Sequence, residues 1–246
     1  MDRIIYTSMT GANAAAHRQS VLANNLANAS TNGFRAEMST FRSVPLQGDG
    51  STTRVFALEA TSGYVDKPGP VQRTGRALDA MAVGNAWFAV QGLDGLEAYT
   101  RNGGFEVSPT GALLTNTGLT VLSDGGGPID VPPNSEVSLG SDGTLTAKTA
   151  GQPPAAIGRL KLATPTAEDP LKRGDDGLFR ATSGEQIPND PNARLLSGAI
   201  EGSNVNAVET MVGMIAASRQ FEQQIKMLQT AEADDKAASQ LLSING

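Results

Sequence analysis

The 246-residue chain contains no cysteine and a single histidine, His17. The lack of cysteine excludes disulfide bonds, a thiolate nucleophile and cysteine-ligated metals. Zinc sites need cysteines or several histidines, and a serine–histidine triad needs a histidine beside its nucleophile. His17 follows two alanines in a segment expected to be helical, off its apolar stripe, where a solvated surface histidine is expected. The composition therefore predicts no catalytic residue, no metal site and no cofactor.

Other ligand-binding patterns are incomplete. Residues 173–185, RGDDGLFRATSGE, superficially resemble a calcium loop but lack alternating carboxylates, so a plain Asp-Gly turn is expected there. The glycine-rich stretches at 48–50 and 125–127 lack the Lys-Ser/Thr of a phosphate loop. A catalytic pair of carboxylates stays open, although the aromatic content of 4% argues against a sugar-stacking groove.

Basic runs and long apolar runs are missing as well. The formal net charge is −6, and no cluster of Lys or Arg occurs, so the basic surface that nucleic-acid binding needs is not expected. No apolar stretch approaches the ~20 residues that span a bilayer, so the chain is not expected to be embedded in a membrane. The N-terminal residues also lack the basic region and apolar core of a secretory signal, which predicts no export by that route.

The sequence does contain a helical pattern at its N-terminal end. Over residues 1–30, apolar or small residues recur at alternating steps of four and three, which predicts an amphipathic helix. The pattern stops in the segment 28–33, NASTNG, whose side chains compete for backbone hydrogen bonds. The predicted stripe consists of Ile5, Met9, Ala12, Ala16, Ala23 and Leu26.

A second, longer helix is predicted over residues 204–243, with Ser203 or Asn204 as its N-cap. It far exceeds the mean helix length of about 11–12 residues. A long helix with a narrow stripe usually pairs with another helix, although apolar residues at helical spacing also fit an ordinary core within one chain. The stripe consists of Ala207, Met211, Met214, Phe221, Ile225, Leu228 and Leu242.

Between the two ends, short alternating segments with turn signals predict an antiparallel β domain over residues 76–202, of sandwich or irregular barrel type. Asp-Gly pairs, which favour turns with positive φ, occur at 94–95, 124–125, 142–143 and 176–177. Residues 35–75 are poor in core residues and are expected to form an extended linker. The expected fold is α+β. Its terminal helices, 1–34 plus 203–246, pair as a coiled-coil-like assembly domain, and the all-β domain is inserted between them.

Residues 22–41, LANNLANASTNGFRAEMSTF, resemble the N-terminal signature of bacterial flagellar rod and hook proteins. The signal is specific, because two adjacent asparagines are unfavourable inside a helix and rarely arise from patterning alone. Segments 74–91, 99–113 and 129–145 are similar to β-domain motifs of this family, and 201–242 to its C-terminal helix. The segments MDRIIY, FRSVP and DDGLFR resemble the proximal-rod branch more than the distal-rod or hook branches.

The resemblance implies a structural, non-enzymatic subunit of the basal-body rod in the periplasmic space. It implies contacts with other copies of the chain and with other rod proteins, and export through the flagellar type III apparatus without a cleaved signal. Asparagine side chains are expected to bond across a helix interface, and Gly33 is expected to end the first helix at positive φ. Subunit contacts are expected at Ile5, Met9, Asn24, Asn25, Leu26, Asn28, Gly33, Phe34, Met211, Met214, Phe221, Ile225, Leu228 and Leu242.

Three further expectations remain open from the sequence. The terminal segments 1–30 and 205–246 are expected to be mobile in the isolated subunit and ordered on assembly. A distal-rod or hook-type subunit, or a subunit of another surface fibre, is the nearest alternative. A hydrolase-type β domain on a helical stalk is an alternative of a different class, and it requires a pocket with convergent polar groups.

Overall fold

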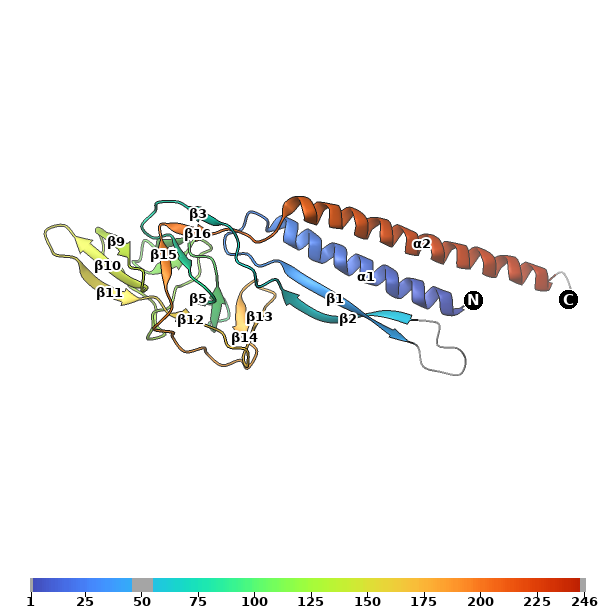
Figure 1. The fold of residues 1–246 in the computed structure, drawn as a ribbon, viewed down its shortest axis with the longest axis horizontal. Coiled ribbons are helices and arrows are strands. Elements are labelled where there is room, and N and C mark those ends of the chain that lie inside the picture. Colours follow the sequence, from blue (N-terminus) through green and yellow to red (C-terminus); the bar gives the residue numbers. More distant parts are fainter. Residues whose placement is uncertain (1, 46–54, 244–246) are drawn as a thin grey trace. The chain divides into compact units, whose positions relative to one another are not determined.

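A computed structural model describes residues 2–45 and 55–243 of the chain (Figure 1). The fold is α+β, with a helix at each end of the chain and antiparallel strands between them, as the sequence predicts. The chain forms two compact units. Unit 1 comprises Met1–Ala29, Ala36–Val65 and Val205–Gly246, and unit 2 comprises Ser30–Arg35 and Asp66–Asn204. The expected assembly domain at 1–34 plus 203–246 is thus extended by residues 36–65, while residues 30–35 fall to unit 2.

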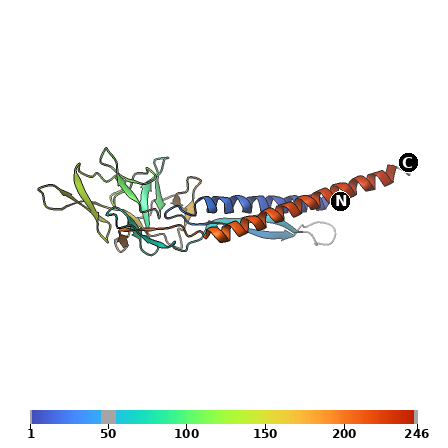
Figure 2. The same ribbon diagram turned by 90° about the horizontal axis from the view of Figure 1, so that it is seen from above.

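Unit 1 is built on two helices, α1 (Asp2–Ala27) and α2 (Ala207–Ser243), which pack against each other. A Cβ on Gly11 would lie 2.9 Å from the Gln224 side chain, and a Cβ on Gly213 would lie 3.2 Å from that of Leu22. These two contacts run in opposite order along the helices, so the pair is antiparallel. Figure 2 shows the same arrangement from above. The glycines let the helix backbones approach closely at both places.

The buried face of α1 is shifted by about one residue from the predicted stripe. Ser8, Ala12 and Ala15 are 2–5% exposed, whereas Met9 is 46% exposed. The reason is that α1 contacts α2 and also the two strands of a hairpin, so small side chains are needed where these elements approach.

The seam of α2 also departs from the predicted stripe. Five members of the predicted stripe are half-buried, namely Ala207, Met214, Phe221, Ile225 and Leu228, but the buried residues of α2, Thr210, Ala217 and Ala231, are not in it. Met211 is 50% exposed, while Thr210 and Ala217 are buried in its place. The side chain of Leu242 lies outside the described residues. The seam consists of Thr210, Met214, Ala217, Phe221, Gln224, Leu228 and Ala231.

The N-cap of α2 is Asn206 rather than Ser203 or Asn204. Asn206 Oδ1 accepts hydrogen bonds from the amides of Val208 at 3.1 Å and Glu209 at 3.3 Å. Asn204 instead donates its side-chain amide to the carbonyl of Lys67 at 2.8 Å. Residues 203, 204 and 206 are all polar and suit an N-cap. The side chain of Asn204 is bonded to Lys67, and Asn206 caps the helix.

The described parts of residues 35–75 do not form the expected extended linker, and residues 46–54 lie outside the described residues. β1 (Glu37–Pro45) and β2 (Val55–Tyr64) pair antiparallel over their whole length, and both contact α1. His17 of α1 is exposed, as expected, and its ring meets the Phe41 ring edge-on at 6.1 Å between centroids. The half-buried positions of β1 are Glu37, Ser39, Phe41 and Val44, only two of them apolar, which is why the sequence gives a weak strand signal.

Unit 2 consists of small antiparallel sheets. The largest has the order β12-β5-β6-β14-β13, and a second has the order β11-β10-β9. Two-stranded sheets join β15 to β4, β16 to β3 and β7 to β8. Their bounds are β3 (Val71–Arg73), β4 (Ala80–Ala82), β5 (Trp87–Gln91), β6 (Glu97–Thr100), β7 (Phe105–Val107), β8 (Leu113–Thr115), β9 (Ser135–Leu139), β10 (Thr144–Thr149), β11 (Ala155–Arg159), β12 (Leu162–Ala163), β13 (Leu171–Arg173), β14 (Phe179–Ala181), β15 (Leu195–Ser197) and β16 (Ala199–Glu201).

A single apolar cluster forms the main core of unit 2. Phe88, Phe105 and Leu113 are each 0% exposed, and the rings of Phe88 and Phe105 meet edge-on at 5.1 Å. Strands from four of the five sheets contribute to the cluster, namely β4 with β15, β5 with β12, β7 with β8, and β9 with β10. Unit 2 is therefore one folded body despite its divided sheets.

Three hairpin turns of unit 2, at residues 92–96, 140–144 and 174–178, share one geometry. In each, the amide of the first residue donates to the carbonyl of the fifth at 2.8 Å. The aspartate Oδ1 accepts from the amide of that fifth residue at 3.1 Å. The glycine after the aspartate has positive φ, which confirms three of the four predicted Asp-Gly turns. At 124–125 the prediction is wrong by one residue, because Gly126 carries the positive φ.

Candidate assembly site

The first candidate contact surface is an apolar stripe at the start of α2. Val208, Met211, Val212 and Ile215 are 71%, 50%, 62% and 55% exposed. At 3.6 residues per turn these positions share one helix face, roughly opposite the seam that meets α1. Large apolar side chains gathered on an exposed face mark an interaction surface. We call these four residues the α2 stripe.

A smaller exposed set lies near the start of α1. Tyr6 is 58% exposed and Met9 is 46% exposed, and their spacing of three places them on neighbouring parts of one helix face. Ile5, next to them, is half-buried. Of the two expected contact residues Ile5 and Met9, Met9 is therefore the more exposed.

The asparagines of the signature segment bond within their own chain instead of across a helix interface. The Asn25 side chain donates to the Glu37 carbonyl at 2.9 Å and accepts from its amide at 2.8 Å. Asn24 donates to Glu37 Oε2 at 3.0 Å, and Asn28 donates to Asn24 Oδ1 at 2.8 Å. The asparagine side chains of this segment thus attach the start of β1 to the end of α1. Leu26, in the same segment, is half-buried.

Gly33 and Phe34 are buried inside unit 2, so their expected role in subunit contacts is replaced by a role within the chain. Gly33 has φ +70°, as predicted, and its amide donates to the carbonyl of Glu201 at 2.7 Å. Phe34 is 8% exposed, with the Arg173 guanidinium 4.5 Å from its ring centroid. Helix α1 has already ended at Ala27, so Gly33 positions the following segment rather than the helix end.

A buried charged cluster lies next to Gly33 and is not predicted by the local sequence. Glu201 pairs with Arg35 at 2.8 Å and with Arg101 at 2.7 Å, and these three side chains are 1–3% exposed. The feature of the sequence that indicates this cluster is Glu201, a single acidic residue at the end of the apolar strand Ala199–Glu201. A charge at the end of a buried strand needs a partner of opposite sign.

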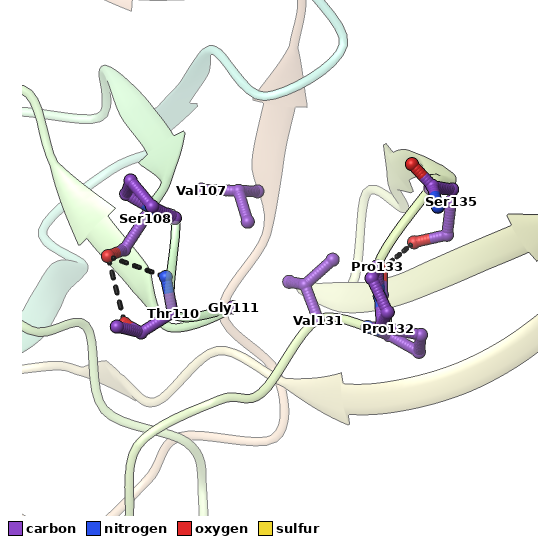
Figure 3. Close-up of a pocket in the computed structure, with 10 residues that line it drawn as sticks. Val107, Ser108, Thr110, Gly111, Val131, Pro132, Pro133 and Ser135 are labelled. Atoms are coloured by element: carbon purple, nitrogen blue, oxygen red, sulfur yellow. Dashed lines mark hydrogen bonds between the residues drawn. The ribbon is translucent and has the colours of Figure 1, made fainter.

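Unit 2 also holds a cavity of about 500 Å³ between the turn at 107–111 and the loop 131–135 (Figure 3). Its hydroxyls serve local turns. Ser108 Oγ lies 2.9 Å from Thr110 Oγ1, and Ser135 Oγ donates to the Pro132 carbonyl at 2.7 Å. Figure 3 shows Val107 and Val131 beside these groups. The lining of this cavity holds no acid, base or nucleophile paired for catalysis.

The titratable groups with perturbed pKa values act as structural braces. The hydrogen bond from Arg180 holds the pKa of the Asp176 carboxyl below its usual value, and burial raises the pKa of the Tyr99 hydroxyl. Arg180 also binds Asp94 at 2.8 Å, which braces the turn at 92–96 that exposes Leu93 and Leu96. Among the described residues, no group of three or more His, Asp or Glu side chains is placed to hold a metal ion.

Family models match three parts of the chain. Residues 5–35 match the flagella basal body rod protein model, and residues 81–147 match the D1 domain of the flagellar hook protein FlgE/F/G. Residues 196–241 match the C-terminal model of the flagellar basal body rod FlgEFG proteins.

Several relatives match over their full length, and two of them are FlgF proteins of enteric bacteria. The flagellar basal-body rod protein FlgF of Salmonella typhimurium is 43% identical over 254 residues, and that of Escherichia coli is 44% identical over 254 residues, with 100% of each chain covered. The chain belongs to the flagellar basal-body rod protein family. The rod protein FlgG of Buchnera aphidicola subsp. Schizaphis graminum is 32% identical, over 96% of this chain and 98% of its own length. Within the rod family the resemblance is therefore to FlgF, in agreement with the sequence motifs.

The two terminal rod-family models include both partners of the buried ion pair. The N-terminal match ends at residue 35, and the C-terminal match, which starts at 196, includes Glu201. The α2 stripe also lies inside the C-terminal match. In the described parts of this rod-family chain, residues 2–45 and 55–243, neither helix has a stretch long and apolar enough to cross a membrane.

Proposed function

We propose that the chain is a structural, non-enzymatic subunit of the flagellar basal-body rod, located in its proximal part in the periplasmic space. The full-length similarity to FlgF rod proteins supports this, and the similarity to FlgG rod proteins is lower. The cavity at 107–111 and 131–135 offers no catalytic group, so the hydrolase alternative gains no support from it. Export through the flagellar type III apparatus, without a cleaved signal, is part of the proposal.

The α2 stripe is the observation that carries the assembly mechanism. Its four side chains are 50–71% exposed on a helix whose other face meets α1. Fully burying one such side chain contributes about 1.5–3 kcal/mol, so covering the exposed parts of all four contributes on the order of 5 kcal/mol. Taken alone, this corresponds to roughly millimolar affinity. Two free subunits therefore stay apart, and stable binding requires several such contacts at once.

Because a single such contact is weak, a subunit is expected to bind to an existing rod, where it contacts several neighbours at once. A subunit that uses one surface to contact a different surface of its neighbour makes heterologous contacts, which build open helical assemblies. We propose that the partners are other copies of this chain and other rod proteins. In each subunit the antiparallel helices α1 and α2 act as a coiled-coil-like pair. The residues proposed to contact neighbouring subunits are Ile5, Met9, Asn24, Leu26, Asn28, Met211, Met214, Phe221, Ile225 and Leu228, together with Val208, Val212 and Ile215.

The thin seam between the helices supports their mobility before assembly. Thr210 and Gln224 lie in the seam of α2, and Ser8 lies on the buried face of α1. Burial of polar side chains contributes less to stability than burial of apolar ones. We propose that α1 and α2 fluctuate in the isolated subunit and become fully ordered when neighbours cover the α2 stripe.

The test is a double substitution, Val212→Glu with Ile215→Glu, in the full-length chain expressed in cells that lack the natural copy. We expect the variant to fold in unit 2, with unchanged fluorescence of Trp87, but to be missing from purified basal bodies. Gln220→Glu with Gln223→Glu is the matched control, since it adds the same two negative charges at exposed positions of the same helix outside the stripe. Normal incorporation of the double variant would refute the proposed surface.

A further inference from the structure

Two leucines project into solvent from the hairpin turn at 92–96 of unit 2. Leu93 is 92% exposed and Leu96 is 62% exposed. The Gly92 amide donates to the Leu96 carbonyl at 2.8 Å, and the Leu96 amide donates to Asp94 Oδ1 at 3.1 Å, so the turn has a fixed geometry. We call Leu93 and Leu96 the tip.

The turn itself does not need a leucine at position 93. The turns at 140–144 and 174–178 have the same hydrogen bonds, and their second residues are Ser141 and Asp175. A serine or an aspartate therefore suits this backbone as a leucine does, and both interact with water more favourably. Turn geometry does not account for Leu93, whereas contact with an apolar surface of another molecule does.

No charge opposes contact between the tip and an apolar surface. Asp94 is the only charged residue of the turn, and its Oδ2 lies 2.8 Å from Arg180 Nη2. Because this carboxylate is already paired, covering the tip does not require a new basic partner. A suitable partner surface is therefore apolar, uncharged and concave.

The cavity between the turn at 107–111 and the loop 131–135 has these properties. Val107 and Val131 lie between the turn and the loop (Figure 3), and none of the ten lining residues is charged. The hydroxyls of the lining are bonded locally, so an incoming apolar side chain deprives none of them of a partner. The volume of about 500 Å³ lies within the roughly 300–1,000 Å³ of ligand pockets, which leaves room for leucine side chains.

Backbone bonds hold the walls of this cavity in place. The Val131 amide donates to the Gly111 carbonyl at 2.7 Å, which joins the loop to the turn. Pro132 and Pro133 follow in the loop, and the ring of each proline fixes its φ. A rigid tip and a rigid cavity lose little conformational freedom on binding, which favours contact between them.

We propose that the tip of one copy of the chain inserts into the cavity at 107–111 and 131–135 of a second copy. The chain does not make this contact with itself, since Leu93 is 92% exposed. Because the tip and the cavity are different surfaces, the contact is heterologous and continues from copy to copy. It adds a contact through unit 2 to the one through the α2 stripe, and it rests on the proposed rod function only in that a rod brings copies together.

Disulfide trapping tests the contact directly, because the chain contains no cysteine. Full-length Leu96→Cys and Ser135→Cys, with tags of different length, are mixed at high concentration under a mild oxidant. We expect the mixed dimer to form on the order of tenfold faster than either homodimer, because insertion of the tip brings the two thiols together. Random collision would instead give a mixed dimer at a rate between those of the two homodimers.

Two further substitutions on the Leu96→Cys chain test the role of the tip. Leu93→Asp introduces the residue that the turn at 174–178 has at this position, so the turn should form and the excess of mixed dimer should disappear. Ser141→Asp is the matched control, since it adds the same charge at the corresponding exposed position of the turn at 140–144. It should leave the excess unchanged.

A second pair of substitutions, on the Ser135→Cys chain, tests the cavity. Val107→Asp places a charge in the lining and should abolish the excess of mixed dimer. Val71→Asp is the matched control, since Val71 is an exposed valine of β3 outside the lining, and it should keep the excess.

Three results would overturn the proposal. They are a mixed dimer that forms no faster than the homodimers, an excess that persists in both Leu93→Asp and Val107→Asp, and a Leu96→Cys homodimer that forms fastest, which would indicate contact between two tips. Trapping in solution needs no rod. Its failure would therefore leave the rod function standing, which incorporation into basal bodies tests separately.

Discussion

The carboxamide of Asn25 pairs with the backbone of Glu37 as a neighbouring strand would, accepting from its amide at 2.8 Å and donating to its carbonyl at 2.9 Å. Asn25 is 5% exposed at the end of α1, and Glu37 is the first residue of β1. A helix side chain thus binds both backbone groups of the first residue of β1. This pairing gives a physical reason for an asparagine at a position that disfavours it by helix propensity.

Asn25→Asp should weaken unit 1, because the carboxylate cannot donate to the Glu37 carbonyl and is itself buried. Loss of a buried hydrogen-bond partner costs about 1–3 kcal/mol. Hydrogen exchange at the amides of Glu37 and its neighbours in β1 would measure the effect. Asn13→Asp, at an exposed position of α1, is the control and should leave β1 unchanged. Equal behaviour of the two variants would show that the pairing does not stabilise the hairpin.

Asn206→Ala should shorten α2 at its start. The Asn206 side chain accepts from the amides of Val208 and Glu209, and loss of such a cap costs about 1 kcal/mol. Far-ultraviolet circular dichroism should show lower helicity at a given temperature. Asn206→Asp keeps an accepting oxygen and should retain most of the helix; a loss as large as that of the alanine variant would contradict the assigned cap.

Phe221→Ala should disrupt assembly while unit 2 stays folded. Phe221 is half-buried in the seam of α2, so the cost should fall below the ~3–5 kcal/mol of a fully buried phenylalanine. We expect reduced helicity in the isolated subunit, poor incorporation into basal bodies and unchanged Trp87 fluorescence. Rods that form at normal yield from this variant would contradict the role of the seam.

Unit 2 should lose stability in acid partly through Asp176. The hydrogen bond from Arg180 lowers the pKa of Asp176 in the folded state, so the unfolded chain binds its proton first as the pH falls. The stabilisation of the folded state by the Asp176–Arg180 hydrogen bond is fully present above the unfolded pKa of about 3.9. It is lost as the pH falls through the lower pKa of Asp176 in the folded state. Asp176→Asn should flatten the dependence of the unfolding temperature on pH below this value, and Asp175→Asn should not. An unchanged slope in Asp176→Asn would refute this assignment.

The sequence predicts the larger elements and the turns well, because their signals are local. The helices expected over 1–30 and 204–243 are found as Asp2–Ala27 and Ala207–Ser243. The turns at Gly95, Gly143 and Gly177 follow from the conformational freedom that an Asp-Gly pair brings to a hairpin.

The misses come from tertiary contacts that local patterns do not encode. Met211 is exposed and Thr210 is buried because the face of α2 that meets α1 carries Thr210 and not Met211. Local patterns do not predict the β1–β2 hairpin, because only two of the half-buried residues in β1 are apolar. The pairing of Arg35 with Glu201 joins residues far apart in the chain, and no spacing rule predicts such a contact.

The central claim is that this chain is a rod subunit that joins its neighbours through the α2 stripe. The most direct test is a structure of the assembled basal body by electron cryo-microscopy, with the burial of Val208, Met211, Val212 and Ile215 measured there. In the isolated chain these side chains are 50–71% exposed. The account predicts that each becomes buried against a helix of an adjacent rod subunit. A rod in which these four side chains face solvent would contradict it.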